Sequence, residues 1–233
     1  MNGDIPTELL PPRGLQESTI FIKDSKGHSS FNSWELSKNK TTFSIKAFKE
    51  QFQVTIPYLT SRVIGYSLVA SLYIAEYFEI DTKEIQKILS SSLLPPGRST
   101  VLDGINSSTL IDSTYNSSYY ATVSMLEVLL SYPGKRKIAV LGDMRELGSL
   151  AKEEHENLAG DIIKYKIDNV VLVGPHMKEF VVPYLLKSGM DENSVQHFPN
   201  TYQAGIFIKE RLLQKGDVLL LKASQNTLLF EII

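Results

Sequence analysis

The sequence contains no cysteine and only one tryptophan among its 233 residues. The lack of cysteine excludes a disulfide framework and any thiolate metal site, and it fits a cytoplasmic protein. Neither charge dominates, because 24 lysine and arginine residues are balanced by 26 aspartate and glutamate residues. A net charge of −2 gives no basic footprint for nucleic acid, so we expect no nucleic-acid partner.

Long apolar runs are missing as well. The amino terminus, MNGDIPTELLPPRG, has no basic segment followed by an apolar one and is not expected to be a secretory signal. The segment VIGYSLVASLYIAEYF comes closest to a membrane span, but serine, tyrosine and glutamate interrupt it before the ~18 apolar residues that a span needs. We therefore expect no membrane span and predict a buried amphipathic helix over residues 62–78. Its apolar positions are Val63, Ile64, Leu68, Leu72 and Ile74.

Several short motifs that carry chemistry are absent. The glycine pattern G-x-G-x-x-G does not occur, since no two glycines stand two positions apart. The phosphate loop G-x-x-x-x-G-K-[ST] is missing, and so is a G-x-S-x-G nucleophile elbow. The four histidines share no metal-ligand spacing, and we expect no metal ligand in this chain. A dinucleotide-binding fingerprint and an α/β-hydrolase active site therefore have no support.

What is present divides into two parts. Residues 18–57 alternate apolar and polar side chains as antiparallel strands do, in the segments STIFIK, TTFSIKAF and QFQVTIP. Two helices are predicted next, the one over residues 62–78 and a second over residues 82–91 with Asp81 as its N-cap. Pro95-Pro96-Gly97 then marks a linker or hinge.

The second part begins near residue 108, where short apolar strands alternate five times with helices. This alternation predicts an α/β domain with a mainly parallel, Rossmann-like sheet and helices on both faces. We place the domain boundary at the hinge, with one domain over residues 1–97 and the other over residues 98–233. The predicted strands are STLIDST, RKIAVLGD, NVVLVG, SVQHFP and DVLLLKAS, and the predicted helices cover residues 118–131, 150–166, 176–188 and 201–214.

Polar residues follow three of these strands. They are the DSTYN segment at 112–116, the LGDMRELG segment at 141–148, and Lys222 with Ser224. Because the carboxyl ends of parallel strands share one edge, where such sheets bind ligands, we expect the three groups to lie along that edge, within reach of Arg98.

Each group also has a simpler explanation. Asp112 with its two hydroxyl neighbours could cap the next helix, and Asp143 could cap the turn that follows it. Lys222 could be solvated, and His155 could lie on an exposed helix face.

In combination these segments resemble the Mur ligase family. The matching segments are PGR, LIDSTYNSS, IAVLGDMRELG with a histidine seven residues later, and LLLKAS. The GDM-x-ELG segment and the Asp-x-Thr-Tyr-Asn turn are typical of the branch that joins D-alanyl-D-alanine to UDP-N-acetylmuramoyl-tripeptide. The resemblance covers about residues 40 to 233. It implies a smaller α+β remnant of the family's central ATPase domain, followed by its C-terminal domain.

The resemblance also implies a function. Members of this branch are ATP-dependent ligases of peptidoglycan synthesis that form an amide bond through an acyl phosphate. ATP and Mg²⁺ are the implied cofactors, UDP-N-acetylmuramoyl-peptide and D-alanyl-D-alanine the implied substrates, and a cytoplasmic monomer the implied state. The family's phosphate loop and magnesium-binding acids would lie upstream of this chain, so we expect the chain to be inactive by itself.

Residue roles follow from the same resemblance. Arg98 resembles the hinge arginine that contacts the ATP phosphates, a task that suits a planar guanidinium. Asp112 resembles the carboxylate that holds the ribose hydroxyls. Tyr115 and Asn116 resemble the residues that line the nucleotide side of the cleft.

The remaining motif positions fall on the substrate side or on the scaffold. Lys222 and Ser224, together with Asn116, are expected near the substrate, and Lys222 joins Arg98 as a catalytic candidate. Three further positions match the family and are expected to be mainly structural: Asp143, Glu146 and His155.

Two alternatives stay open. The first is a non-catalytic binding or interaction module that kept the fold. The missing phosphate loop favours it, as do Val63 and Tyr66, which stand where the family carries asparagines. The second is another branch of the superfamily, such as a folate polyglutamate or cyanophycin ligase. The Asp-x-Thr-Tyr-Asn turn and the GDMRELG segment argue against it. Ser113 also departs from the family, which usually has a second acid there.

Overall fold

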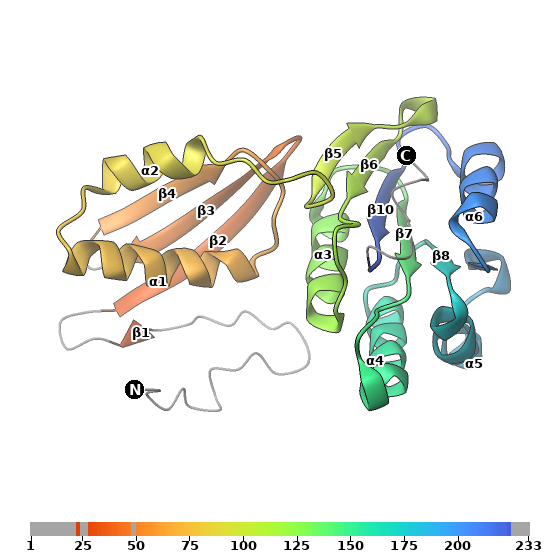
Figure 1. Ribbon diagram of the computed structural model, residues 1–233. Coiled ribbons are helices and arrows are strands. Elements are labelled where there is room, and N and C mark those ends of the chain that lie inside the picture. The colour runs from red at the N-terminus through yellow and green to blue at the C-terminus, as the bar shows by residue number, and fades with distance from the viewer. Residues whose placement is uncertain (1–21, 24–27, 48–49, 225–233) are drawn as a thin grey trace. The chain divides into compact units, whose positions relative to one another are not determined.

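The computed structural model describes residues 22–23, 28–47 and 50–224 (Figure 1). The protein has two compact units, of which the first ends at Ser92 and the second begins at Leu93. Two short earlier segments belong to the second unit, Leu36–Lys40 and Tyr58–Ser61. The boundary between residues 97 and 98 stays a prediction. No helix in the described residues is long and apolar enough to span a membrane.

The first unit is a four-stranded sheet with two helices (Figure 1). Its strands lie in the order β1-β2-β3-β4, and β3 and β4 are antiparallel with Phe43 opposite Val54. The predicted alternation is confirmed in β4, because Val54 and Ile56 are buried while Gln53 and Thr55 are exposed. Part of the strand predicted at 18–23 lies outside the described residues. The elements are β1 (Ile22–Lys23), β2 (His28–Ser37), β3 (Lys40–Ala47), β4 (Glu50–Ile56), α1 (Val63–Tyr77) and α2 (Thr82–Ser90).

The two helices of this unit were predicted with different success. Asp81 is the N-cap of α2, as predicted, since its carboxylate accepts a hydrogen bond from the Lys83 main-chain nitrogen at 2.9 Å. For α1 the predicted buried face is partly wrong. Three of its five positions are exposed, namely Val63, Ile64 and Ile74. Apolar residues lie on both the exposed and the buried sides of α1, so the spacing alone does not select a face, and the buried hydrophobic residues among those described are Leu68, Val69, Leu72 and Ala75.

The second unit is a six-stranded sheet in the order β5-β6-β10-β7-β8-β9. The five predicted strands are all present and parallel, which confirms the α/β fold with a mainly parallel sheet. The sequence pattern does not reveal β5, a short, mostly half-buried edge strand antiparallel to β6. The strands are β5 (Thr100–Asp103), β6 (Thr109–Asp112), β7 (Lys137–Gly142), β8 (Asn169–Val173), β9 (Val195–Phe198) and β10 (Val218–Lys222).

Helices cover both faces of this sheet, as predicted. On one face, alternate residues of the central strands, including Val140 and Leu219, pack with Ala204 and Ile208 of the last helical segment. On the other face, α3 contacts β7 and β10 and packs against α4. The helices are α3 (Tyr119–Ser131), α4 (Ala151–Lys164), α5 (Val182–Lys187) and α6 (Thr201–Phe207). Wider π-helical turns, Met177–Val181 and Ile208–Leu212, precede α5 and follow α6.

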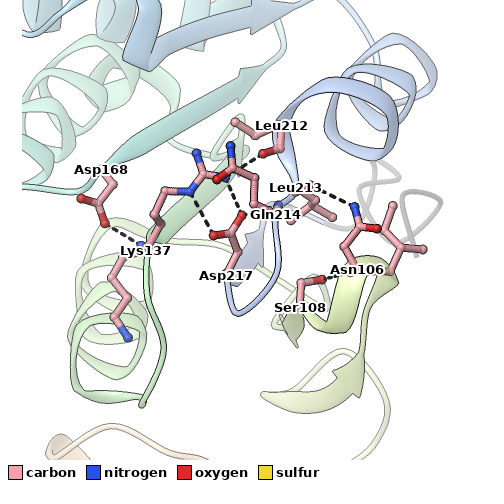
Figure 2. Close-up of polar contacts among 10 residues, drawn as sticks. Asn106, Ser108, Lys137, Asp168, Leu212, Leu213, Gln214 and Asp217 are labelled. Carbon is pink, nitrogen blue, oxygen red and sulfur yellow. Dashed lines mark hydrogen bonds and ion pairs between the residues drawn. The ribbon is translucent and has the colours of Figure 1, made fainter.

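An ion pair between a half-buried arginine and a buried aspartate links the amino ends of two central strands (Figure 2). Arg136, just before β7, donates from Nε to Asp217 at 2.9 Å, and Asp217 stands just before β10. The same guanidinium donates to the Leu212 carbonyl at 2.7 Å, and the Gln214 nitrogen donates to Asp217 at 2.7 Å. Burial would raise the pKa of Asp217, but these hydrogen bonds outweigh it and lower the pKa. This network therefore ties the starts of β7 and β10 to the segment that follows α6.

Candidate functional site

The predicted site residues lie at the carboxyl ends of three adjacent strands. Asp112 is the last residue of β6 and Lys222 is the last residue of β10, while Asp143 directly follows β7. Because β10 lies between β6 and β7, all three residues reach the same edge of the sheet. The predicted convergence on one edge is thus confirmed for these strands.

Asp112 shapes the turn that follows its strand. Its side chain is 7% exposed, and Oδ1 accepts hydrogen bonds from the Thr114 main-chain nitrogen at 3.0 Å and hydroxyl at 2.7 Å. The other oxygen, Oδ2, accepts no hydrogen bond within the part of the chain that the structure describes. The simpler explanation of helix capping is wrong, because Ser118 is the N-cap of α3 and accepts from the Ala121 nitrogen. Asp112 therefore has one carboxylate oxygen without a hydrogen bond among the described residues.

Arg98 reaches this turn from the hinge. Its guanidinium carbon lies 3.9 Å from the centroid of the Tyr115 ring, and both residues are exposed. The Tyr115 nitrogen donates to the Gly97 carbonyl at 3.0 Å, which ties the hinge to the turn. Gly97 has φ +77°, and a side chain there would come within 3.2 Å of the Tyr115 nitrogen. The hinge thus holds an exposed arginine against Tyr115, three residues after Asp112.

Lys222 is buried within the same turn. It is 4% exposed, and Nζ donates to the Ser113 carbonyl at 3.2 Å and also to the Asn116 carbonyl. Burial, with a smaller contribution from Arg98, lowers the pKa of Lys222 to about 8, while Asp112 acts in the opposite direction. The explanation of Lys222 as a solvated strand-end lysine is wrong.

The other two predicted contact residues differ in their surroundings. Asn116 is exposed, and its side-chain oxygen accepts from the Ser117 nitrogen at 2.8 Å. Ser224 is buried, and its hydroxyl accepts from the Arg145 nitrogen at 3.0 Å. Ser224 therefore supports the loop after β7, whereas Asn116 belongs to the turn around Lys222.

The loop after β7 rests on Asp143 and His155. The Asp143 carboxylate accepts from the Met177 nitrogen at 3.0 Å, so it anchors the segment after β8 and does not cap its own turn. His155 is fully buried, and its Nε2 accepts from the Met144 nitrogen at 3.2 Å. Its Nδ1 donates to the Ala151 carbonyl at 2.6 Å, which fixes the tautomer. Placing His155 on an exposed helix face is wrong, and these contacts support the structural roles expected for both residues.

A group of possible metal ligands occurs at this loop. Donor atoms of Asp143, His155 and His176 lie within 4.8 Å of one another, and no other such group is found among the described residues. Both nitrogens of His155 are already hydrogen-bonded, however, and Mg²⁺ prefers oxygen ligands. The group does not fit the magnesium of an ATP-dependent enzyme. The sequence spacing does not reveal it, because the two histidines lie on separate segments.

A cavity of about 450 Å³ opens beside this group. It lies at the loop after β7 and not at the Asp112 turn. Its lining residues are Asp143, Met144, Arg145, Glu146, Leu147, Gly148, Ala151, Pro175 and His176. Glu146 has φ +65°, a left-handed conformation that is unusual for a residue with a side chain.

Comparison with known proteins decides the family. The Mur ligase glutamate ligase domain matches residues 97–225, which is more than half of the chain. The chain belongs to the Mur ligase family. This Mur ligase chain is 28% identical to the UDP-N-acetylmuramoyl-tripeptide–D-alanyl-D-alanine ligase of Bacillus subtilis over 225 residues, 94% of this chain and 48% of that protein. The Synechocystis ligase of the same name is 28% identical over 160 residues, 68% of this chain and 34% of that protein.

Solved structures extend the likeness to the fold of both units. A MurF ligase from Thermotoga maritima in complex with ADP matches with a TM-score of 0.68 and 25% identity over 89% of this chain and 45% of that one. MurF from Acinetobacter baumannii matches with a TM-score of 0.71 and 22% identity over 87% of this chain and 43% of that one. This Mur ligase chain thus spans about a third to a half of the length of its relatives.

Proposed function

We propose that this chain belongs to an ATP-dependent ligase that joins D-alanyl-D-alanine to UDP-N-acetylmuramoyl-tripeptide through an acyl phosphate. Relatives from Bacillus subtilis and Synechocystis bear the name of that ligase, and a solved relative contains ADP. The observation that carries the proposal is the arrangement around the β6–α3 turn. There the exposed Arg98 stacks on Tyr115, and Asp112 in the same turn has one carboxylate oxygen without a hydrogen bond among the described residues, so the turn offers a guanidinium for phosphate and a carboxylate for sugar hydroxyls.

In this proposal each residue has a defined task. Asp112 Oδ2 accepts a hydrogen bond from a ribose hydroxyl, and Arg98 moves from the Tyr115 ring to the phosphates. Arg98 is free to do so, because it is exposed and its recorded partner is a ring face, a contact worth about 0.5–1 kcal/mol at exposed sites. Asn116, exposed at the end of the turn, and Ser224, which follows β10 and is bonded to the loop after β7, would lie on the substrate side.

In this proposal the described residues contact the ribose and the phosphates of the nucleotide. ATP would supply the phosphoryl group that activates the substrate carboxylate, and Arg98 would offset the charge that develops on it. The described part of the chain has no cluster of carboxylates suited to Mg²⁺, so in this proposal the metal ligands belong to other parts of the ligase. We propose a cytoplasmic monomer, consistent with a reaction that consumes ATP.

The test is a ligation assay on the polypeptide that contains this chain. Phosphate release would be measured with Mg-ATP, UDP-N-acetylmuramoyl-tripeptide and D-alanyl-D-alanine, for the wild type, Arg98→Ala and Asp112→Ala. Each variant should lose about tenfold or more in kcat/KM, the equivalent of one charged hydrogen bond of about 1.5–3 kcal/mol. Lys209→Ala, on an exposed helical position, is the control. Normal turnover in both site variants would refute the residue assignment, and substrate binding without turnover would favour a non-catalytic module.

A further inference from the structure

We propose that Lys222 is a positioning residue. Its ammonium group holds the Asp112–Asn116 turn in the shape that presents Asp112 to a nucleotide, and it does not itself contact substrate. This inference rests on the proposed role of Asp112 in nucleotide binding. The turn and the lysine come from segments about a hundred residues apart, joined side by side through the pairing of β6 with β10.

The first support is the direction of the lysine side chain. Lys222 is the last residue of β10, and its amine is bonded to the main-chain carbonyls of Ser113 and Asn116, which lie three residues apart in the turn. A single cation thus joins the beginning and the end of the turn. With 4% of the residue exposed, the amine has little access to a ligand in solution.

The second support is that the turn has few other long-range attachments. The Ser113 nitrogen donates to the Leu221 carbonyl at 2.9 Å, and the Tyr115 nitrogen donates to Gly97 at 3.0 Å. The remaining bonds are local, from Thr114 to Asp112. Among the described residues, the Asn116 main chain has one long-range hydrogen bond, which its carbonyl accepts from Lys222. Removing it would free the half of the turn that carries Asn116.

The third support is electrostatic. Burying a charged lysine is costly, and here two carbonyl oxygens and the nearby Asp112 carboxylate offset part of that cost. Arg98 is the other charged group that acts on Lys222, and it acts unfavourably. Neutral Lys222 would hold the carbonyls more weakly than the ammonium does, because charge-assisted hydrogen bonds are the stronger ones. The shape of the turn should therefore depend on the protonation of this lysine.

The ligand-free test uses NMR on the whole 233-residue chain. In the wild type, the carbonyl ¹³C shifts of Ser113 and Asn116 should titrate together near pH 8. In Lys222→Met, which keeps an unbranched side chain without the charge, the amide protons of residues 113–117 should exchange at least tenfold faster than in the wild type. Amides of β7 and the control Lys209→Met should not change. If the variant does not fold, the wild-type titration decides alone, and carbonyl shifts that stay constant while the Lys222 Nζ resonance itself titrates would overturn the proposal.

A second arm separates this proposal from the proposed function. ADP would be titrated into the wild type and Lys222→Met between pH 7 and 9. The wild type should bind less tightly as the pH rises through 8, and the variant should bind about tenfold more weakly and without pH dependence. Equal affinity of the two proteins would overturn the positioning role. The ligand-free results could hold while ADP causes no chemical-shift change in residues 112–116 of the wild type. Lys222 would then still fix the turn, but the proposed nucleotide binding, and with it the positioning role of Lys222 for a nucleotide, would be refuted.

Discussion

Mg-ATP should bind this chain only weakly, and the structure sets the limit. Asp112 Oδ1 is already engaged by Thr114, so one carboxylate oxygen is left for the ribose. Arg98 can offer two parallel hydrogen bonds to phosphate. Three charged hydrogen bonds of about 1.5–3 kcal/mol each give about 4.5–9 kcal/mol before the cost of association, which is at least ~4 kcal/mol. The net of about 5 kcal/mol or less corresponds to a dissociation constant of ~0.2 mM or weaker.

Titration of the labelled chain with Mg-ATP, followed by NMR, measures this constant directly. Asp112→Ala should weaken binding by about tenfold, because it removes the ribose contact and the order of the turn. Asp191→Ala is the matched control, since that aspartate caps a short turn elsewhere and should leave the affinity unchanged. A dissociation constant in the low micromolar range would refute the reasoning, because it would require about 8 kcal/mol from contacts that these residues do not offer.

Three further outcomes concern stability and can be measured by urea unfolding. Gly174→Ala should cost at least about 3 kcal/mol, because the new methyl group would lie 2.6 Å from the Asp143 carboxylate, whereas Gly189→Ala, with a left-handed backbone but open space, should cost about 1 kcal/mol. Asp217→Asn should lower the free energy of unfolding by about 3 kcal/mol at pH 7. Because folding lowers the pKa of Asp217, the wild type should lose stability as the pH falls below about 3.8, and the variant should not show that loss. Folding lowers the pKa of Lys222 from 10.5 to about 8, so the unfolded chain binds this proton more tightly than the folded protein does. The free energy of unfolding should therefore rise by up to about 3 kcal/mol between pH 8 and 10.5, and Lys222→Met should abolish the rise. A flat stability profile over that range in the wild type would contradict the last of these.

The parallel sheet could be predicted because its strands are buried on both faces. A strand such as β7 must then be apolar at nearly every position, and all its residues from Ile138 to Gly142 are indeed buried. Edge and surface elements carry no such requirement. The short strand β5 is half-buried, and α1 is apolar on its exposed as well as its buried side, so neither the strand nor the buried face of the helix could be read from the sequence.

The site could be predicted only as far as the topology determines it. Parallel strands bring Asp112 and Lys222 to one edge whatever their side chains do. Whether Lys222 is solvated or buried depends on carbonyl groups about a hundred residues away in the sequence, and no local pattern encodes that. The same holds for His155, whose burial and tautomer follow from its bond to the Met144 nitrogen across the loop.

The departure at Ser113 can now be judged from its contacts. Ser113 takes part in the turn through its main-chain nitrogen, which donates to Leu221, and its carbonyl, which accepts from Lys222. Its hydroxyl makes no hydrogen bond within the described residues, so any residue with the same backbone conformation would leave these attachments in place. Replacing the family's acid with serine therefore removes a charge from this edge without altering the support of the turn. Asp112 is the carboxylate that remains in this turn.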